Sequence, residues 1–431
     1  MKLLVNPSPE KWQKQLARPV QKTKEINKII KPIFEKVERS GDKALKKFAQ
    51  EYDHVHLDSL IVTDEEIKAS KNQISKELRD AIKVAKANIE SFHAAQATEE
   101  LVMEVMPGVV CRRKSVPVQK VGLYIPGGTA PLFSTVLMLG VPAKLAGCKE
   151  IVLCSPPNRE GKIHPAILYT AELVGITKIV KAGGAQAVAA MTLGTDSVPK
   201  VDKIFGPGNQ YVTAAKQLAT KYGVAIDMPA GPSEVLVYAD ETAIPSFVAA
   251  DLLSQAEHGI DSQVVLVTTT ERFAKKVLKE INEQLEDLPR KDIAFKALQN
   301  STTVVMEDQE IALELINDYA PEHLIIAVKE EEKVLENIYN AGSVFIGNFT
   351  PESVGDYASG TNHTLPTYGY AKNYSGVSLD SFVKKMTYQK ITPEGLKSLG
   401  PVVEVMAANE QLEAHKNAVT VRLNYLKDKK K

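Results

Sequence analysis

Two series of short apolar segments constrain the fold more than any other feature of this sequence. The first series contains VGLYI, EIVLC, KIVKA, DKIF and VAID, and the second contains SEVLVYA, QVVLVT, TTVVM, HLIIA and SVFIG. Stretches of helical length, such as HPAILYTAEL and QYVTAAKQLATKY, separate the segments. Strands that alternate with helices form parallel sheets through right-handed connections. The sequence therefore predicts an α/β protein with two parallel-sheet globules.

The flanking segments predict further elements. Residues 23–98 are charged and helix-rich, with Asp64 as a predicted helix cap. VMEVMPGVVCRRKSVPVQKVGLYIPGG alternates and predicts strands that end in a Pro-Gly-Gly turn. A long loop, SGTNHTLPTYGYAKNYSG, follows Asp356, and loops of this length are usually functional. SLDSFVKKMTYQKI then predicts a strand, followed by two helices, the last of them capped by Asn409.

Composition excludes several classes of partner. The chain has 431 residues, of which 53 are Lys or Arg and 53 are Asp or Glu, so no excess positive charge points to a nucleic acid. The longest uncharged stretch, residues 121–143, is interrupted by Pro and Gly, which argues against a membrane-spanning helix. The N-terminal MKLLVNPSPEKW lacks the apolar length of a secretory signal, and the KDKKK end is predicted to be a solvated tail. We expect no nucleic-acid or membrane partner and a cytoplasmic location.

The cysteines, Cys111, Cys148 and Cys154, form no CxxC pair and have no His nearby in sequence. Small buried hydrophobic residues in a reducing compartment are the favoured interpretation. One of them would be catalytic only if the chain oxidised an aldehyde through a thiol.

The histidines can be weighed one by one. His54 and His56 are predicted to share a solvated strand edge, while His93 and His164 are predicted to be surface or cap residues. His258 follows Gln255 by three residues, which stacks the two on one helix face. This pair could be half of a metal site, but spacing alone favours a polar helix end. The other histidines in polar or Gly-rich surroundings are His323, His363 and His415.

In YAPEHL, Glu322 and His323 stand where a helix is predicted to end and a strand to begin. Pro321 favours an extended Ala320. A carboxylate and an imidazole are the best general bases near neutral pH. Their place at the amino end of a strand counts mildly against them, because most sites in parallel sheets lie at the carboxyl edge.

Two glycine-containing turns, in KAGGAQAVAAM and GPGNQY, precede helical segments. Backbone N–H groups and the helix dipole can meet a phosphate at such turns. Neither turn fits GxGxxG, so the residues permit a dinucleotide site without establishing one.

Several long segments together resemble one family, histidinol dehydrogenase, in the same order over nearly the whole chain. These segments are VGLYIPGGTAPLFSTVLMLGVPAKLAG, GPGNQYV, DMPAGPSEVLV, DLLSQAEHG, YAPEHL and GSVFIGNFTPESVGDYASGTNHTLPT. The resemblance implies NAD-dependent oxidation of L-histidinol through L-histidinal to L-histidine, the last steps of histidine biosynthesis. It also implies one zinc ion per subunit.

The resemblance carries residue roles onto this sequence. It implies that Glu322 and His323 are the catalytic pair, with His323 as base for the alcohol and Glu322 as activator of the water that attacks the aldehyde. The implied metal ligands are Gln255, His258, Asp356 and His415. The implied substrate contacts are Ser233, Gln255, His258, His323, Asp356, Glu410 and His415. The implied NAD contacts are Tyr124, Gln186 and Asn209.

The resemblance further implies two incomplete Rossmann-like globules and a homodimer with shared active sites, in which the partner supplies Glu410 and His415. The expected domains are an N-terminal arm (1–23), a first globule with the metal and catalytic residues (24–120 and 234–375), an NAD-binding globule (121–233) and a C-terminal domain that reaches the partner (376–431).

Two alternatives stay open on the sequence alone. A thiol-type NAD-dependent aldehyde dehydrogenase would need an activated cysteine, and none has an obvious activating neighbour. A non-catalytic NAD- or zinc-binding regulator would have no use for Glu322 beside the metal ligands. The choice between zinc and manganese is also left open.

Overall fold

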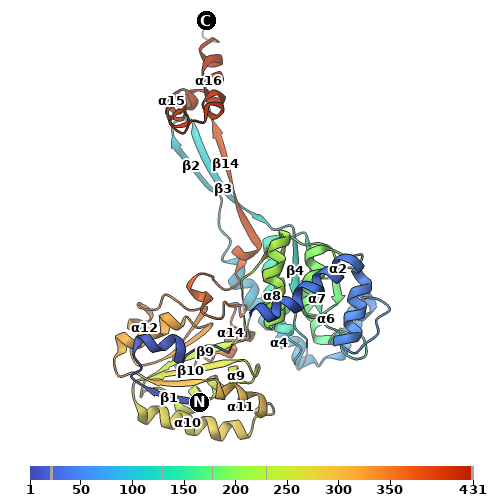
Figure 1. Ribbon diagram of the computed structural model, residues 1–431, viewed down its shortest axis with the longest axis vertical. Helices are drawn as coiled ribbons and strands as arrows, with labels where there is room; N and C mark the ends of the chain where they lie inside the picture. The colour runs from blue at the N-terminus through green and yellow to red at the C-terminus, as the bar shows by residue number, and fades with distance from the viewer. Residues whose placement is uncertain (20–22, 128–129, 177, 230, 429–431) are drawn as a thin grey trace. The chain divides into compact units, whose positions relative to one another are not determined.

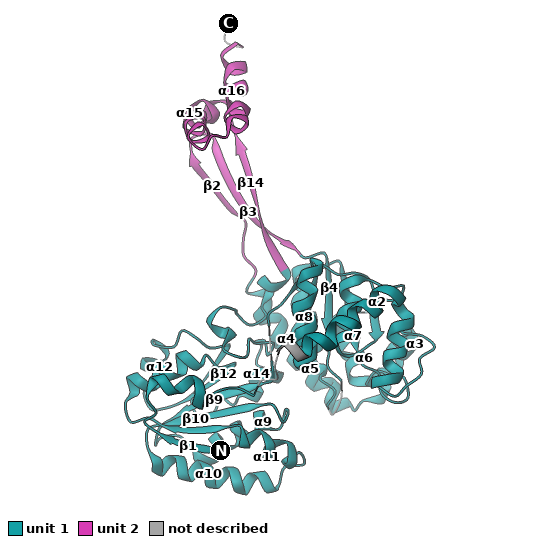
Figure 2. Cartoon of the chain, viewed as in Figure 1, with its two compact units in different colours: residues 1–96, 118–382 teal, residues 97–117, 383–431 magenta. Residues whose placement is uncertain are grey.

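The computed structural model describes residues 1–19, 23–127, 130–176, 178–229 and 231–428. The chain divides into two compact units, one formed by residues 1–96 and 118–382 and the other by residues 97–117 and 383–431 (Figure 2). Parts of two predicted features, Gly128 of the Pro-Gly-Gly turn and residues 429–431 of the charged tail, lie outside the described residues.

The first unit contains a parallel sheet with the strand order β1-β11-β10-β9-β12-β13 (Figure 1). Its strands are β1 (Lys2–Val5), β9 (Glu234–Ala239), β10 (Gln263–Thr268), β11 (Thr302–Val305), β12 (His323–Ala327) and β13 (Ser343–Ile346). With β1 set aside, the strands follow the order third, second, first, fourth, fifth. This is the Rossmann order without its sixth strand.

A second parallel sheet in the same unit has the strand order β6-β5-β4-β7-β8. Its strands are β4 (Lys120–Tyr124), β5 (Glu150–Ser155), β6 (Lys178–Lys181), β7 (Lys203–Phe205) and β8 (Ala225–Ile226). The order is again third, second, first, fourth, fifth. The prediction of two incomplete Rossmann-like sheets is confirmed, and every strand of both apolar series forms where it was expected.

Helices cover both faces of each sheet, which is why the strands are apolar throughout and do not alternate with polar residues. In β9, Val235 and Val237 pack under α9 (Pro245–Ala256), α10 (Glu271–Glu286) and α11 (Lys291–Gln299). Leu236 and Tyr238 point to the opposite face, where α12 (Gln309–Tyr319) and α13 (Glu331–Leu335) lie. Because successive side chains of a strand point to opposite faces of the sheet, this one strand contributes to the hydrophobic cores on both faces.

The second sheet has the same layered construction. One face packs against α2 (Thr23–Tyr52), α7 (Gly184–Leu193) and α8 (Gln210–Ala219). The other face packs against α3 (Asp64–Ser70), α4 (Lys76–Ala94), α5 (Phe133–Ala146) and α6 (Pro165–Val174). We expected residues 24–120 in the first globule, whereas α2, α3 and α4 contact helices of this second one. An amphipathic helix does not encode which sheet its apolar face will cover.

The N-terminal arm belongs to the six-stranded sheet. β1 pairs in parallel with β11, Lys2 opposite Thr302. Trp12 and Leu16 then enter the core beneath β9 and β10, and the Trp12 indole N–H donates to the Pro7 carbonyl at 2.9 Å. The arm therefore closes one edge of the sheet.

The second unit is a long antiparallel ribbon that carries a helical pair. Its strands are β2 (Leu101–Met106), β3 (Val109–Pro117) and β14 (Val383–Ile391), in the order β14-β3-β2. The helices α15 (Pro393–Asn409) and α16 (Glu413–Asp428) pack on each other, with Gly400 facing Leu423. Many apolar side chains of this unit are exposed, among them Val102, Met103 and Val405.

Two predicted helix boundaries are wrong. Asn409 ends α15 and does not cap α16, because Gln411 adopts a left-handed conformation with φ 59° that separates the helices. At α3 the cap is Thr63, not Asp64: the Thr63 hydroxyl accepts from the Glu66 N–H at 3.2 Å, and the Glu66 carboxylate accepts from the Thr63 N–H at 2.9 Å. This reciprocal arrangement is a capping box.

Among the described residues, no helix is long and apolar enough to cross a membrane.

Candidate active site

The candidate catalytic residues lie at the amino ends of two neighbouring strands, β9 and β12, where the strand order of the first sheet reverses. Ser233 directly precedes β9, Glu322 precedes β12, and His323 is the first residue of β12. The helix α9 also ends at this edge, and its last turn carries Gln255. The strand order and the end of α9 therefore bring Ser233, Gln255, Glu322 and His323 together at one edge of the sheet.

The chain enters β12 through an unusual backbone conformation. Ala320 ends α12 with φ 48° and ψ 70°, so the extended conformation predicted from Pro321 is wrong. Left-handed backbone is disfavoured for Ala and costs on the order of 1–3 kcal/mol. The Ala320 N–H still bonds to the Ile316 carbonyl at 2.9 Å, which completes the helix end. The sharp turn directs Glu322 and His323 into the sheet edge.

Glu322 and His323 are both buried. The Glu322 Oε2 accepts a hydrogen bond from the Glu234 N–H at 2.9 Å, and it lies 3.7 Å from His323 Nδ1. Burial raises the pKa of Glu322, and the neighbouring His323 opposes this shift only in part. Burial acts to lower the pKa of His323, but the charges of Glu322, Asp356 and Glu352 outweigh it and raise the pKa. The pair can therefore hold protons that an exposed pair would release.

Gln255 connects the catalytic histidine to the backbone. Its Nε2 donates to the Glu234 carbonyl at 3.3 Å and lies 3.0 Å from His323 Nδ1. Its side chain is fully buried, and its Oε1 has no hydrogen-bond partner among the described residues. A buried amide oxygen without a partner is costly unless a ligand occupies it.

Asp356 and His258 complete the cluster within the first unit. Asp356 lies on α14 (Glu352–Tyr357), with Oδ1 3.3 Å from His323 Nε2. Burial acts to raise the pKa of Asp356, but the three nearby imidazoles lower it overall, so the carboxylate stays ionised. His258 lies in the turn after α9, where the protein atoms packed around its ring lower its pKa despite the charge of Asp356.

These three side chains offer an amide oxygen, a carboxylate and a neutral imidazole, which are the donor types that zinc accepts. The unpartnered Gln255 Oε1 is the observation that fits a bound cation. In the part of the chain that the structure describes, no group of three or more His, Cys, Asp or Glu residues is placed to hold a metal ion. The remaining predicted ligand, His415, and the predicted substrate contact Glu410 belong to the second unit, where both are exposed.

Glu352 is a site residue that sequence reasoning missed. It is 1% exposed, its Oε1 lies 2.8 Å from the Ser254 hydroxyl, and its Oε2 has no partner among the described residues. Burial raises its pKa to about 8, against the opposing charge of His323. The available signal was its position four residues before Asp356, which puts both on one face of α14.

His363 links the cluster to the second sheet. Its Nδ1 lies 2.8 Å from the Asp356 carbonyl, and its Nε2 lies 3.1 Å from the Thr135 hydroxyl on α5. The neighbouring Asn362 donates to the Met138 carbonyl at 2.6 Å and lies 3.3 Å from His93 Nε2. His93 is therefore fully buried, and its prediction as a surface or cap residue is wrong. The prediction of a cap is confirmed for His164, whose Nδ1 accepts from the Ala166 N–H at 3.2 Å.

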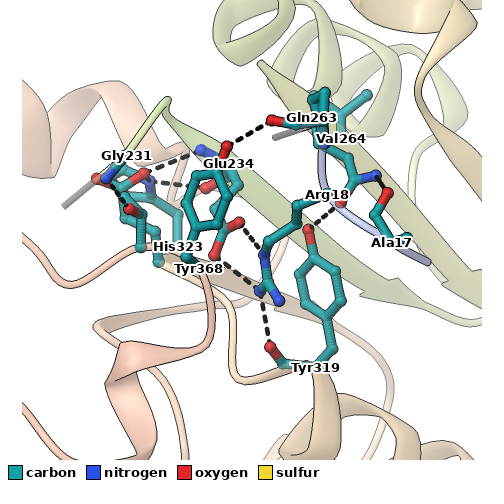
Figure 3. A network of polar contacts seen from close by, with 12 residues as sticks. Ala17, Arg18, Gly231, Glu234, Gln263, Val264, Tyr319, His323 and Tyr368 are labelled. Atoms are coloured by element: carbon teal, nitrogen blue, oxygen red, sulfur yellow. Dashed lines mark hydrogen bonds and ion pairs between the residues drawn. The ribbon is translucent and has the colours of Figure 1, made fainter. Parts of the chain in front are cut away.

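A buried ionic network extends from Arg18 through Glu234 to the catalytic His323 (Figure 3). Arg18 of the N-terminal arm forms a two-point contact with the Glu234 carboxylate, and it donates to the Tyr319 carbonyl at 2.7 Å. Its guanidinium lies 3.9 Å from the centre of the Tyr319 ring. The backbone of the same Glu234 holds Glu322, His323 and Gln255. Arg18 thus fixes the residue around which the cluster is arranged.

A cavity of about 870 Å³ lies at the carboxyl ends of the second sheet, and its lining includes Tyr124, Gln186 and Asn209. The Tyr124 hydroxyl accepts from the Gly184 N–H at 3.1 Å. The Asn209 Oδ1 caps α8 by accepting from the N–H of Tyr211 at 3.0 Å. The three predicted NAD contacts therefore border one cavity.

Glycines let the backbone approach this cavity closely. A Cβ at Gly183 would meet Pro156 at 2.5 Å, and one at Gly206 would meet the Tyr124 carbonyl oxygen at 2.1 Å. Gly184 begins α7 with φ 61°. A turn of this kind at a helix N-terminus fits a dinucleotide pyrophosphate.

The cysteines are free thiols, and Cys148 and Cys154 are buried. Burial raises the pKa of Cys148 to about 11 and that of Cys154 to about 12. Thiols in this state are poor nucleophiles. The prediction that these two are packing residues is confirmed.

Two Rossmann-like sheets, one beside a dinucleotide-sized cavity and the other beside a buried carboxylate–imidazole pair, define a class of α/β dehydrogenases. The profile of one family, histidinol dehydrogenase, matches residues 16–423. The chain belongs to the histidinol dehydrogenase family, and it is an oxidoreductase.

The relatives cover nearly the whole chain. The histidinol dehydrogenase of Bacteroides thetaiotaomicron is 60% identical over 427 residues, which are 99% of this chain and 100% of that protein. That of Haemophilus influenzae is 56% identical over 412 residues, 95% of this chain and 96% of the relative. The crystal structure of histidinol dehydrogenase from Elizabethkingia anophelis is 56% identical, covers 99% of both chains and has a TM-score of 0.96.

Proposed function

We propose that this chain oxidises L-histidinol to L-histidine by way of L-histidinal, with two NAD reduced per substrate, as the final steps of histidine biosynthesis. The observation that carries this proposal is the buried Glu322–His323 pair beside the unpartnered oxygen of Gln255. Membership of the histidinol dehydrogenase family supports the substrate.

The first oxidation removes a hydroxyl proton and a hydride from the alcohol carbon. His323 accepts the proton when its imidazole is neutral, and Gln255 and the Glu234 carbonyl fix the orientation of its ring. The hydride passes to the nicotinamide, which leaves the aldehyde. Because two electrons leave with each hydride, a second transfer is needed to reach the acid.

The second oxidation begins with water. Glu322 removes a proton from a water molecule as the oxygen attacks the aldehyde carbon, and His323 returns the proton of the first step to the carbonyl oxygen, which gives the hydrate. Loss of a second hydride from the hydrate, with a proton passing to His323, gives the carboxylic acid. The raised pKa of Glu322 makes it a stronger base than an exposed carboxylate.

A zinc ion would be held by Gln255, His258 and Asp356, with His415 of a partner subunit. Bound there, zinc would coordinate the imidazole and amine of the substrate and so orient its alcohol carbon. The same donors accept manganese, so metal-free protein should be reconstituted with each ion separately. A chelator should abolish turnover, and readdition of the correct ion should restore it.

We assign NAD to the cavity that Tyr124, Gln186 and Asn209 border, so that residues 121–233, together with the helices α2, α3 and α4 that cover their sheet, form the cofactor globule and residues 234–375 carry the chemistry. Ser233 stands between the two as a substrate contact. Three free cysteines are consistent with the cytoplasm, which keeps thiols reduced.

We propose that the active form is a homodimer, in which residues 376–431 of one chain complete the active site of the other. His415 and Glu410 lie in a separate compact unit and are exposed, and that unit exposes apolar side chains such as Val405. Exposed apolar surface of this kind is typical of an interface.

Subunit complementation tests the shared site. A His415→Ala chain and a His258→Ala chain should each be inactive. Mixed dimers should regain activity, because half of their sites combine an intact tail with an intact core. If mixed dimers form and stay inactive, each chain builds its own site.

The function itself is tested by counting NADH against L-histidinol consumed. Two NADH per substrate, with little free aldehyde, are expected. One NADH per substrate, or no oxidation by metal-loaded protein, would contradict the proposal.

A further inference from the structure

The cavity beside the second sheet has two distinguishable walls. Gly127, Ala130 and Pro131 form one wall, just before α5. Ile29, Ile30 and Ile33 of α2 line the cavity as well. Because α5 and α2 cover opposite faces of the sheet, these two walls stand on opposite sides of the cavity.

Hydrogen bonds identify which wall adjoins the chemistry. Thr135 of α5 contacts His363 at 3.1 Å, and His363 contacts the Asp356 carbonyl at 2.8 Å. The reacting nicotinamide must therefore approach the α5 wall. The glycine turn at Gly184 meets the pyrophosphate, which leaves the adenosine half for the α2 wall with its apolar isoleucines.

Asp53 stands at the adenosine end. It directly follows α2, and both of its sequence neighbours, Tyr52 and His54, also line the cavity. Its Oδ2 is buried without a hydrogen-bond partner among the described residues. Burial raises its pKa to about 6, so the carboxylate is ionised at neutral pH.

Dinucleotide sites of the Rossmann type hold the adenosine ribose with a carboxylate at the end of the second strand. Here the second strand, β5, ends at Ser155 and continues as Pro156, Pro157 and Asn158, without an acid. Among the described residues that line the cavity, Asp53 is the only carboxylate. The position that carries the ribose-binding carboxylate in such sites therefore has no acidic residue here. Asp53, at the end of α2, supplies a carboxylate to the same cavity.

We propose that Asp53 selects NAD over NADP, its carboxylate accepting hydrogen bonds from the adenosine ribose hydroxyls and repelling the 2′-phosphate of NADP. This inference rests on the proposed use of NAD in this cavity. It adds a determinant of cofactor choice to the predicted contacts Tyr124, Gln186 and Asn209.

Two positively charged side chains of the same cavity affect the choice between NAD and NADP differently from Asp53. Arg159 and Lys162 line it and are exposed, and Lys162 lies 3.8 Å from Glu160. NADP carries one phosphate more than NAD, so these positive charges favour NADP at least as much as NAD. Arg159→Ala is therefore the opposing control, because it should weaken NADP at least as much as NAD and cannot reproduce the effect of Asp53→Asn.

Direct titration calorimetry of NAD and NADP tests the proposal. The wild-type protein should prefer NAD, and Asp53→Asn should reduce the ratio of the two affinities by about 10- to 100-fold, the usual worth of a charged hydrogen-bonding group. Nicotinamide mononucleotide should bind wild type and Asp53→Asn equally, because it lacks the adenosine half. An unchanged NAD-to-NADP ratio in a folded Asp53→Asn protein would overturn the proposal.

A second comparison needs no variant. Wild-type protein should bind AMP more tightly than adenosine 2′,5′-diphosphate, which differs from it only by the 2′-phosphate, and equal binding would also overturn the proposal. NADH formation from L-histidinol by the wild type is measured in parallel. Its absence would contradict the proposed function, whereas normal turnover with an unchanged cofactor ratio would remove only the role of Asp53.

Discussion

The two parallel sheets share one strand order but present their functional residues at opposite edges. The cofactor cavity lies at the carboxyl edge of its sheet, where α7 begins. The catalytic cluster lies at the amino edge of the other sheet, where α9 ends. Helix N-termini favour anions and helix C-termini favour cations. The same fold therefore suits a pyrophosphate at one edge and a metal ion or protonated imidazole at the other.

The two regions also differ in what they bury. The cofactor region brings backbone close to the ligand through Gly183 and Gly206, positions where a side chain would clash. The catalytic region buries the ionisable residues Glu234, Glu322 and Glu352. Buried charges are tolerated only with partners, so this region depends on its ionic network more than the cofactor region does.

The largest expected effect separates chemistry from cofactor binding. His323→Asn should lower kcat by on the order of 10²–10⁴, because the proton acceptor is lost. Asn209→Ala should raise the KM for NAD, since Asn209 caps α8 at the cavity. Steady-state kinetics with L-histidinol and NAD measure both variants. A His323→Asn enzyme with most of its kcat would place the base elsewhere.

The Glu322→Gln variant distinguishes the proposed role of Glu322 from that of His323 within the catalytic pair. Because Glu322 is proposed to activate water, oxidation of L-histidinal should fall more than oxidation of L-histidinol. The measurement is rapid-mixing NADH formation from each substrate separately. Equal losses in the two steps would indicate that Glu322 serves both, or neither, as the base.

The next effect is on stability. Arg18→Met should lower the free energy of unfolding by about 3–5 kcal/mol, because the buried Glu234 carboxylate loses its partner. Arg272→Ala, which removes an exposed partner of Glu241, should leave stability unchanged and is the control. Denaturant unfolding followed by circular dichroism gives both values. Similar losses for the two variants would show that the catalytic region does not depend on its buried network.

A smaller effect concerns pH. Asp251 lies one helical turn before Gln255, and burial raises its pKa to about 7 from 3.8. A carboxyl with a raised folded-state pKa contributes stability below pH 3.8 that is lost as pH rises through about 7. Asp251→Asn should therefore raise the Tm relative to wild type more at pH 8 than at pH 5. A Tm difference between Asp251→Asn and wild type that is the same at pH 5 and pH 8 would mean that Asp251 is not desolvated.

The smallest effect on turnover is expected for the cysteines of the cofactor region. Cys148→Ala and Cys154→Ala should leave kcat within a few-fold, with packing losses of about 1–2 kcal/mol. If either folded variant loses aldehyde oxidation, a thiol mechanism replaces the one proposed for Glu322.

The fold was predictable where the signal is local. Each apolar run is a strand because both faces are covered, and that burial is written into the run itself. The pairing of α2, α3 and α4 with the second sheet was not predictable, because apolar periodicity gives a face without naming its partner. The left-handed turn at Gln411 was missed for a related reason, since a Gln does not mark that conformation.

The site residues also divide into those that a local sequence segment indicates and those that only long-range contacts bring into place. YAPEHL and SQAEHG placed Glu322, His323, Gln255 and His258 in recognisable segments, once the resemblance to a family was seen. Glu352 and the Arg18–Glu234 pair were missed because their roles arise from long-range contacts. Glu352 contacts a residue 98 positions away, and Arg18 one 216 positions away. No local sequence pattern indicates a contact between residues so far apart in the chain.

The central claim is that one cofactor cavity and one catalytic cluster carry out both oxidations. L-Histidinol with two deuterium atoms on its alcohol carbon tests this most directly, with NADH analysed by NMR. The account predicts two deuterated NADH per substrate, both labelled on the same face of the nicotinamide, because a single cavity fixes that face. Labels on both faces, or deuterium retained in the product, would contradict it.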